Sequence, residues 1–217
     1  MKTGSDKIEG VLGAVLAGGV SRRMGQDKAL LEFEGQTLIE RAIDVLETAF
    51  DEVVIVAPKR QRYVDLEAEL VPDIRPGLGP VGGIHTALGH GAGRSVFVLA
   101  CDMPYVTAEL VRWITGSDGG NTLPTSGDCR AARPTARVAR DHHGAQPLCG
   151  LYSHGCLSPV EEALNRHRLS AQELLGSLET EYLDLDSGVV WYSPSLLANV
   201  NALQDFADLT ERPGQDP

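Results

Sequence analysis

Short apolar runs punctuate the first half of the chain, and polar or turn-forming residues follow each of them at once. The runs cover residues 11–17, 53–57 and 95–101. Segments of this length without polar and apolar alternation are typical of strands that are buried on both faces. The pattern therefore predicts a parallel sheet with a layer of helices on each face.

Helical patterns fill the segments between these runs. Thr37 and Glu40 form a capping box, and apolar residues then recur at helical spacing as far as Phe50. We expect a further helix that Thr107 caps and that ends near Ile114. Strands that alternate with helices indicate an α/β fold with a mostly parallel central sheet.

The second half of the chain is richer in turn-forming residues. Residues 116–134 are expected to form a long loop, because Gly, Ser, Thr, Asp and Pro predominate there. Residues 135–139 and 147–152 flank a polar stretch at 141–144 that contains two adjacent histidines. This arrangement predicts two antiparallel strands, with the histidines in the turn and not at a metal site.

Two further capping boxes predict short helices after these strands. Ser158 with Glu161 forms the first, and Ser170 with Glu173 forms the second. Residues 203–209 are expected to form a closing helix.

The chain of 217 residues has no repeats and no low-complexity tract, which favours one domain. We place that domain at residues 11–209, with a flexible segment at 1–10 and a polar tail at 210–217.

Acidic residues outnumber basic ones by 30 to 19, which gives a net charge of −11. This balance argues against nucleic acid or an anionic membrane as the main partner, although local cations can still bind a small anion. No apolar run approaches the roughly 18 residues of a membrane-spanning helix. The first ten residues lack the pattern of a signal peptide, so we expect a cytoplasmic protein.

The cysteines and histidines give no metal-binding pattern. Cys101, Cys129, Cys149 and Cys156 contain no C-x-x-C pair, and the six histidines show no zinc-like spacing. We expect four free thiols, buried or half-buried, in a reducing compartment.

The ends of the predicted strands are the places to look for chemistry, because open sheets of this kind bind ligands beyond the carboxyl ends of their strands. After residue 17 come Gly18 and Gly19, and then Arg22, Arg23 and Lys28. Glycines at such a turn let backbone N–H groups approach phosphates, and the cations invert the local charge. The alternative is a glycine-rich turn with solvated cations.

Neither of two familiar nucleotide-binding motifs fits this segment. Val20 stands where the second glycine of G-x-G-x-x-G belongs, and Ala29 stands where the P-loop has the magnesium-binding Ser or Thr. Both the dinucleotide dehydrogenase and the ATPase interpretations are therefore weakened.

Asp102 follows the apolar run 95–101 directly. A carboxylate at this edge of the sheet suits Mg²⁺ that holds substrate phosphates, because Mg²⁺ takes one or two carboxylates together with phosphate and water. The alternative is that Asp102 caps a turn before Pro104.

A loop rich in glycine and proline at residues 73–84 leads into a helical pattern at 84–88. We expect Gly82 and Gly83 to present the N-terminus of that helix to an anion, the alternative being a purely structural loop. Together, the three segments fit phosphoryl or nucleotidyl transfer, which needs positioning and charge neutralisation and no covalent nucleophile.

These residues resemble the molybdenum cofactor guanylyltransferases. The resemblance is carried by LAGGVSRRMGQDKALLEFEGQTLIERAIDVL, GLGPVGGIHTAL, FVLACDMPYV, QPLCGLYS and the stretch ANVN near residue 200. It covers nearly the whole chain in the order of the family. It implies a three-layer, Rossmann-like nucleotidyltransferase fold with a mostly parallel central sheet and helices on both faces.

The resemblance implies an enzyme that transfers GMP from GTP to the phosphate of molybdopterin, or of Mo-molybdopterin, and releases pyrophosphate. It implies Mg²⁺ as the cofactor, with Asp102 as the metal ligand. Molybdoenzymes and other proteins of cofactor biosynthesis are further partners in line with this activity.

Site residues carry over from the family position by position. The catalytic residues would be Arg23, Lys28 and Asp102. The nucleotide would be bound by Leu16, Ala17, Gly18, Gly19, Lys28, Asp73 and Asp102. The second substrate would be bound by Gly82, Gly83, Asn199 and Asn201.

The chain departs from the family pattern at one position. Many members have an Asn that contacts the nucleotide where this chain has Val56, which puts one base or ribose contact in question. The cluster formed by Arg166, His167 and Arg168 is a candidate contact for anionic molybdopterin, the alternative being a solvated helix end.

Other functions remain open from the sequence. The related cytidylyltransferases tend to show LAAG where this chain and the guanylyltransferases show LAGG, so Gly18 and Gly19 favour GTP over CTP. Transfer of CMP to molybdopterin, transfer of a nucleotide to another phosphorylated substrate, and a non-catalytic module that binds a nucleotide or molybdopterin are the alternatives.

Overall fold

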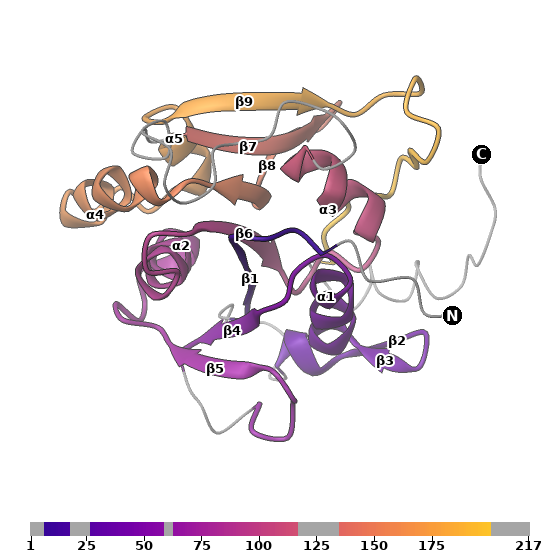
Figure 1. Cartoon of the computed structure of the whole chain (residues 1–217), viewed down its shortest axis with the longest axis horizontal. Coiled ribbons are helices and arrows are strands. Elements are labelled where there is room, and N and C mark those ends of the chain that lie inside the picture. The colour runs from indigo at the N-terminus through magenta and orange to yellow at the C-terminus, as the bar shows by residue number, and fades with distance from the viewer. Residues whose placement is uncertain (1–6, 18–26, 59–62, 117–134, 201–217) are drawn as a thin grey trace.

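A seven-stranded sheet runs through the centre of the protein, in the order β5-β4-β1-β6-β8-β7-β9 (Figure 1). The computed structural model describes residues 7–17, 27–58, 63–116 and 135–200. The strands are β1 (Val11–Leu16), β4 (Val53–Ala57), β5 (Glu69–Pro72), β6 (Ser95–Ala100), β7 (Thr135–Asp141), β8 (Gly144–Tyr152) and β9 (Glu179–Asp184).

Of these seven described strands, β8 alone runs against the others. The pairs β4–β5, β1–β4, β1–β6 and β7–β9 are parallel, whereas β8 is antiparallel to both β6 and β7. Every residue of β1, β4 and β6 is buried. The continuous apolar runs therefore predicted the central parallel strands correctly.

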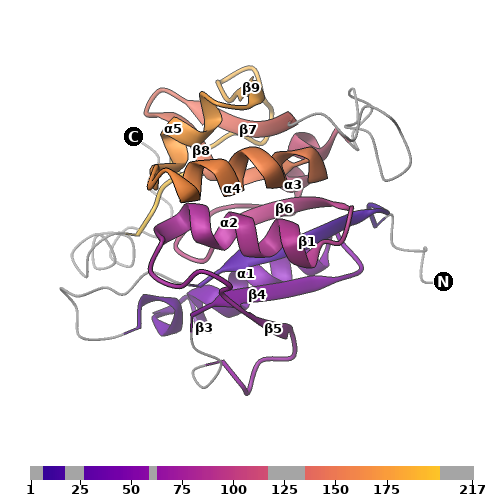
Figure 2. The same cartoon turned by 90° about the vertical axis from the view of Figure 1, so that its left-hand side faces the viewer.

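Helices cover both faces of the sheet. On one face lie α1 (Leu38–Glu47) and α3 (Ala108–Thr115). On the other lie α2 (Gly79–His90), α4 (Leu157–Asn165) and α5 (Ala171–Leu175), which stand in front of the sheet in Figure 2. Each face has its own apolar core, so the predicted α/β fold with three layers is confirmed.

The predicted caps of α1 and α3 are present. Thr37 caps α1, and its backbone N–H donates to the Glu40 carboxylate at 2.9 Å, which completes the capping box. These hydrogen bonds lower the pKa of Glu40. Thr107 caps α3, and that helix ends at Gly116 in the left-handed conformation that glycine favours.

The expected start of α4 at Ser158 is wrong. A short 3₁₀-helix, η4 (His154–Cys156), leads directly into α4, whose first residue is Leu157. Ser158 therefore lies inside the first turn, because the preceding residues have already entered a helical conformation. The cap at Ser170 is correct, since its hydroxyl accepts a hydrogen bond from the backbone N–H of Glu173 at 3.3 Å.

The hairpin of β7 and β8 has its turn at the adjacent histidines, as expected. The N–H of His143 donates to Asp141 Oδ1 at 2.8 Å and tightens the turn. Pattern analysis missed the edge strands β5 and β9, and it also missed the 3₁₀-helix η1 (Lys28–Leu30). It missed the small hairpin of β2 (Glu32–Phe33) and β3 (Gln36–Thr37) as well.

Several expectations concern residues outside the described part of the chain. They are the start of the N-terminal segment, the loop at 117–134, the closing helix at 203–209, the polar tail and Cys129. Cys101, Cys149 and Cys156 are buried free thiols, as expected. No helix within the described residues has both the length and the apolar character needed to span a membrane.

Candidate functional site

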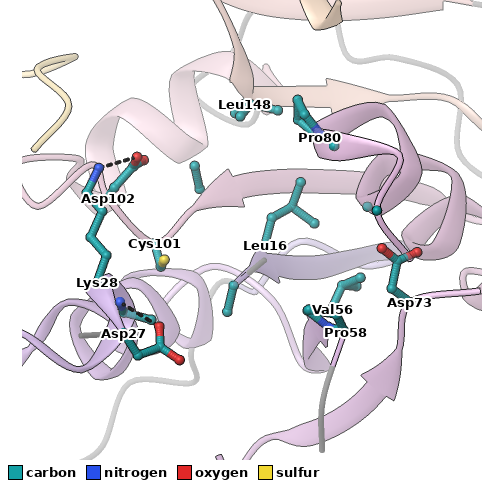
Figure 3. A pocket seen from close by; sticks show the side chains of 16 residues that line it. Leu16, Asp27, Lys28, Val56, Pro58, Asp73, Pro80, Cys101, Asp102 and Leu148 are labelled. Carbon is teal, nitrogen blue, oxygen red and sulfur yellow. Dashed lines mark hydrogen bonds and ion pairs between the residues drawn. The ribbon is translucent and has the colours of Figure 1, made fainter. Parts of the chain in front are cut away.

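A pocket of about 260 Å³ lies at the carboxyl ends of β1, β4, β5 and β6 (Figure 3). Leu16 ends β1, Val56 is near the end of β4, Asp73 follows β5 and Asp102 follows β6, and all four line the pocket. This is the edge of an open α/β sheet at which ligands bind. The structure therefore brings together three segments that the sequence analysis selected separately.

Lys28 and Asp102 form an ion pair at one end of the pocket. The Lys28 ammonium donates to Asp102 Oδ2 at 2.8 Å, and the two side chains are 14% and 27% exposed. Partial burial strengthens such a pair relative to one in open water. This end of the pocket thus holds a cation and a carboxylate side by side.

Backbone hydrogen bonds fix the position of Asp102. Cys101 N–H donates to Leu16 O at 3.3 Å, and Val200 N–H donates to Asp102 O at 2.9 Å. The second bond attaches the stretch that contains half-buried Asn199 to the metal-ligand candidate. Asn201 lies outside the described residues.

Asp73 lies at the opposite end of the pocket, with Leu16 and Val56 between it and the ion pair (Figure 3). Its Oδ1 accepts from the Thr86 hydroxyl at 3.0 Å and from Arg75 N–H at 3.1 Å. These bonds hold the carboxylate in one orientation. The pocket therefore has a charged end, an apolar floor and a second, fixed carboxylate.

The expectation that Gly82 and Gly83 start a helix is wrong, because α2 begins at Gly79. Pro80 needs no N–H partner in a first turn, so the helix can start there. Gly83 lines the pocket, and a Cβ at this position would lie 3.1 Å from the Leu16 side chain. Glycine thus lets α2 approach β1 closely. Gly82 faces the carbonyl of Arg75 instead.

The backbone of β1 at the pocket is already engaged in the sheet. Ala17 N–H donates to Val56 O at 2.9 Å. Leu16 and Ala17 accordingly offer surface to the pocket. Gly18, Gly19, Arg22 and Arg23 lie outside the described residues.

Cys101 also lines the pocket, but its environment does not favour thiolate chemistry. Burial, followed by the nearby charge of Asp102, raises the pKa of the Cys101 thiol to about 12. The thiol is therefore neutral near pH 7 and a poor nucleophile. The charged groups at this end, Lys28 and Asp102, are therefore better candidates for chemistry than the thiol.

The basic cluster at Arg166, His167 and Arg168 lies outside this pocket. Arg166 and Arg168 border a separate hollow between α4 and α5, of about 440 Å³. Arg166 forms an exposed ion pair with Glu162 at 2.6 Å. This arrangement favours the solvated helix end over a contact with the pocket's ligand.

Several lining residues were not selected as site residues from the sequence. They are Pro58, Gly77, Pro80 and Leu148. Gly77, Pro80 and Leu148 lie within stretches that carry the family resemblance, but apolar and small residues are common everywhere in a chain, so their type alone does not indicate a place in a pocket.

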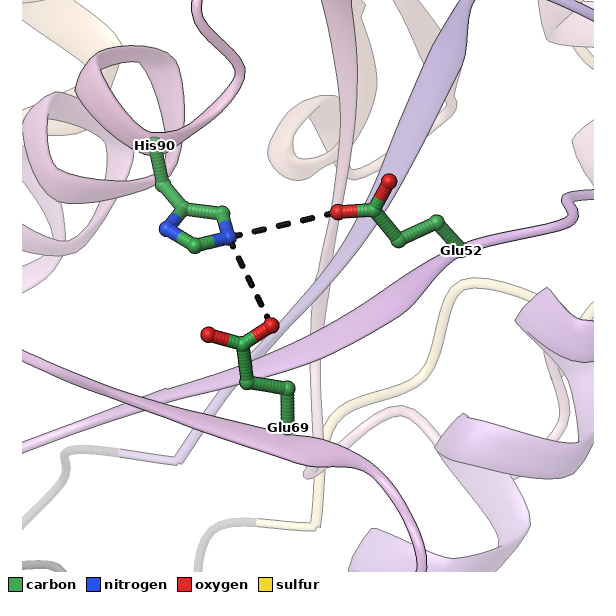
Figure 4. Close-up of side chains that lie close together, drawn as sticks. All are labelled: Glu52, Glu69 and His90. Carbon is green, nitrogen blue, oxygen red and sulfur yellow. Dashed lines mark ion pairs between the residues drawn. The ribbon is translucent and has the colours of Figure 1, made fainter.

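A second charged cluster lies at the opposite ends of the strands. His90 Nε2 at the end of α2 is 4.0 Å from Glu52 and 3.9 Å from Glu69 (Figure 4). The Arg94 guanidinium also contacts both oxygens of Glu52, at 2.6 and 3.1 Å. Because Arg94 already neutralises Glu52, we interpret the cluster as an ion-pair network that connects α2 with β4 and β5.

Replacing Glu52 with glutamine is expected to lower the free energy of unfolding by about 0.5–1 kcal/mol at pH 7, since the pair is partly exposed. The hydrogen bond from Arg94 is the main cause of the lowered pKa of Glu52. A depressed folded-state pKa gives stability that is present above the unfolded value of 4.5 and lost as pH falls through the folded value. Urea unfolding at several pH values measures the difference.

The deficit of the Glu52→Gln variant should shrink as the pH falls below about 4. Glu69→Gln is the matched control, because Glu69 faces His90 at 3.9 Å and lacks the bidentate arginine. An equal deficit for Glu52→Gln at neutral and acidic pH would contradict this interpretation.

Comparisons with known proteins identify relatives of this chain. The chain matches the MobA-like NTP transferase domain over residues 13–181. A protein of Pelotomaculum thermopropionicum, named probable molybdenum cofactor guanylyltransferase, is 36% identical over 171 residues, which cover 79% of this chain and 77% of that protein. A protein of Desulfosudis oleivorans, named molybdenum cofactor guanylyltransferase, is 30% identical over 172 residues, which cover 79% of each chain.

A solved structure is similar in fold. The molybdopterin-guanine dinucleotide biosynthesis protein A of Archaeoglobus fulgidus superposes with a TM-score of 0.73 at 25% identity. The match covers 92% of this chain and 97% of that one.

Proposed function

Because this chain belongs to the family of MobA-like NTP transferase domains, we propose that it is a molybdenum cofactor guanylyltransferase. It joins GMP from GTP to the phosphate of molybdopterin, or of Mo-molybdopterin, and releases pyrophosphate. The observation that carries the proposal is the Lys28–Asp102 pair, 2.8 Å apart, at the charged end of a pocket with an apolar floor. The names of the relatives that cover most of the chain support the choice of substrates.

The two ends of the pocket suit the two ends of a nucleoside triphosphate. The apolar floor at Leu16 and Val56 suits a base and ribose, and the Asp73 carboxylate at the far end suits hydrogen-bond donors on them. Lys28 binds the phosphates at the other end. We assign backbone contacts to Gly18 and Gly19 and a phosphate contact to Arg23, residues outside the described part of the chain.

Asp102 fits a divalent metal ion, which we propose to be Mg²⁺. Its carboxylate is partly exposed in the pocket and accepts a hydrogen bond from the Lys28 ammonium at 2.8 Å, so this position already attracts a cation. When bound there, Mg²⁺ would neutralise phosphate charge. Asp102 would hold the ion, and Lys28 would bind a phosphate oxygen.

The chain needs no general base for this reaction. The attacking group is a phosphate monoester, whose second pKa is about 6, so its oxygen is already ionised at neutral pH. It attacks the α-phosphorus of GTP in line, the bond from that phosphorus to the bridging oxygen breaks, and pyrophosphate leaves. Lys28 and Arg23 stabilise the charge that develops on the leaving group.

We propose that α2 and the stretch before Val200 bind the acceptor. Gly82, Gly83, Asn199 and Asn201 are the proposed contacts. Gly83 lines the pocket, and Asn199 precedes the residue that bonds to Asp102. We further propose that the reaction takes place in the cytoplasm, and that molybdoenzymes or other cofactor-biosynthesis proteins receive the product.

The test is pyrophosphate release by the purified protein with molybdopterin and GTP, CTP or ATP. GTP is expected to support release at least about tenfold faster than CTP or ATP, since about 1.4 kcal/mol of differential binding gives that ratio. Release with CTP alone would make the protein a cytidylyltransferase. Tight binding of GTP without release would make it a binding module, and either result contradicts the proposal.

A further inference from the structure

Tyr63 is a buried tyrosine whose hydroxyl lies beside the pocket without lining it. It lies in the connection between β4 and β5, is 3% exposed, and belongs to the apolar core that contains Ala17 and Ala29. Its hydroxyl donates to Asp27 Oδ2 at 2.9 Å and is 3.4 Å from Ala17 O. A buried phenol usually has such a partner, because an unpaired hydroxyl in the core is costly.

Two acceptors of the Tyr63 hydroxyl among the described residues, Ala17 and Asp27, lie at the two ends of the connection between β1 and η1. Ala17 directly follows β1, and Asp27 directly precedes η1. A side chain from a third segment of the chain therefore contacts both ends. The contact with the carboxylate is the shorter and is charge-assisted, which makes it the stronger of the two.

The Asp27 carboxylate uses its other oxygen to start η1. Oδ1 accepts from Ala29 N–H at 3.2 Å, so Asp27 is the N-cap of this 3₁₀-helix. Lys28 is the first residue of η1, and its ammonium reaches Asp102 at 2.8 Å. One carboxylate thus connects the Tyr63 hydroxyl to the start of η1, the helix that carries Lys28.

We propose that Tyr63 is a positioning residue for nucleotide binding. Its hydroxyl holds Asp27, and Asp27 in turn holds η1 in the orientation that directs Lys28 to the phosphates and to Asp102. The proposal rests on the proposed function, in which Lys28 binds the nucleotide. Tyr63 itself touches no substrate.

The experiment is equilibrium binding of GTP with Mg²⁺, measured by calorimetry on the full chain without an acceptor. Tyr63→Phe keeps the ring in the core and removes the hydroxyl, and it is expected to weaken GTP binding about tenfold. Tyr152→Phe is the matched control. Tyr152 is fully buried and donates to Pro147 O at 2.6 Å, so this variant loses a buried hydroxyl of the same kind elsewhere.

A second variant separates positioning from general destabilisation. Asp27→Asn keeps an oxygen to cap η1 but removes the charge that Tyr63 binds, so it should weaken GTP binding by a similar factor. Because both variants break the same hydrogen bond, between Tyr63 and Asp27, the double variant should bind GTP no more weakly than the weaker-binding single variant. Asp27→Asn also keeps the test decisive if Tyr63→Phe does not fold.

Three outcomes overturn the proposal. The first is unchanged GTP affinity in Tyr63→Phe, or in Asp27→Asn if Tyr63→Phe does not fold. The second is an equal loss of GTP affinity in Tyr152→Phe, and the third is additive losses of GTP affinity in the double variant. If the parent protein binds CTP in place of GTP, the proposed guanylyl transfer fails. The same comparison with CTP then still tests the role of Tyr63.

Discussion

Replacing Asp102 with asparagine is expected to lower the rate of pyrophosphate release by about a thousandfold or more. Asparagine has nearly the shape of aspartate but no negative charge, so it cannot neutralise a divalent cation. The carboxylate follows β6 and faces the pocket beside Lys28, which is where our proposal places the charge of the transferred phosphate. If a metal ion is held at this point, as we propose, its loss would affect the transition state directly.

The Asp102→Asn variant should remain folded. The backbone of Asp102 still accepts from Val200 N–H, and both members of the ion pair are partly exposed, which limits the loss of stability to about 1 kcal/mol. Circular dichroism and thermal unfolding check this. Binding of Mn²⁺, measured by its electron paramagnetic resonance signal, should weaken in parallel with turnover.

Asp184→Asn is the matched control for this prediction. Asp184 pairs with both Nε and Nη2 of Arg140, at 2.6 and 2.9 Å, on the edge strand β9. The substitution removes an aspartate charge and an ion pair but lies away from the pocket, so turnover should be unchanged. Near-parental pyrophosphate release by folded Asp102→Asn would show that Asp102 is not the metal ligand.

Most of the central sheet was predictable because its strands are buried on both faces. Every position of β4 is apolar, and its predicted bounds agree with the structure. The edge strands β5 and β9 escaped the same reasoning, since β5 is only four residues long and β9 has no buried position. An edge strand is stabilised by its neighbour's backbone, which leaves little trace in its own side chains.

Helix starts were predictable where a side chain caps the helix, and not elsewhere. Thr37, Thr107 and Ser170 each accept a backbone hydrogen bond at the expected position. The starts of α2 and α4 have no such side-chain cap. At α4 the capping pattern of Ser158 was present, but the preceding 3₁₀-helix had already begun the turn.

The candidate site was predictable in part because strand ends meet at one edge. Lys28 and Asp102 are 74 positions apart in the sequence, and the strand-end rule alone selected both segments. Tyr63 and Leu148 were not found, because their contribution depends on contacts between distant segments. Val56 lines the apolar floor of the pocket. The loss of the nucleotide contact that an Asn makes at this position in many family members stays an expectation.

Replacing Lys28 with methionine is expected to lower pyrophosphate release by about two to three orders of magnitude and to weaken GTP binding. Methionine keeps the length of the side chain and removes the charge. The Lys28 ammonium lies 2.8 Å from Asp102 Oδ2, and in our proposal it also binds phosphate. The variant therefore loses charge neutralisation at this end of the pocket. Lys7→Met is the matched control, because Lys7 forms a looser pair with Asp51 at 3.7 Å, outside the pocket.

The same variant should bind a divalent cation more tightly when no nucleotide is added. The Lys28 ammonium and a metal ion are both attracted to one carboxylate, so removing the ammonium removes a competitor for Asp102. Mn²⁺ titration followed by electron paramagnetic resonance is expected to give stronger binding for Lys28→Met than for the parent, with Lys7→Met unchanged. General damage to the pocket would lower turnover and metal affinity together, whereas competition at Asp102 moves them in opposite directions. Weaker Mn²⁺ binding by folded Lys28→Met would therefore contradict the assignment of Asp102 as the shared partner of the lysine and the metal.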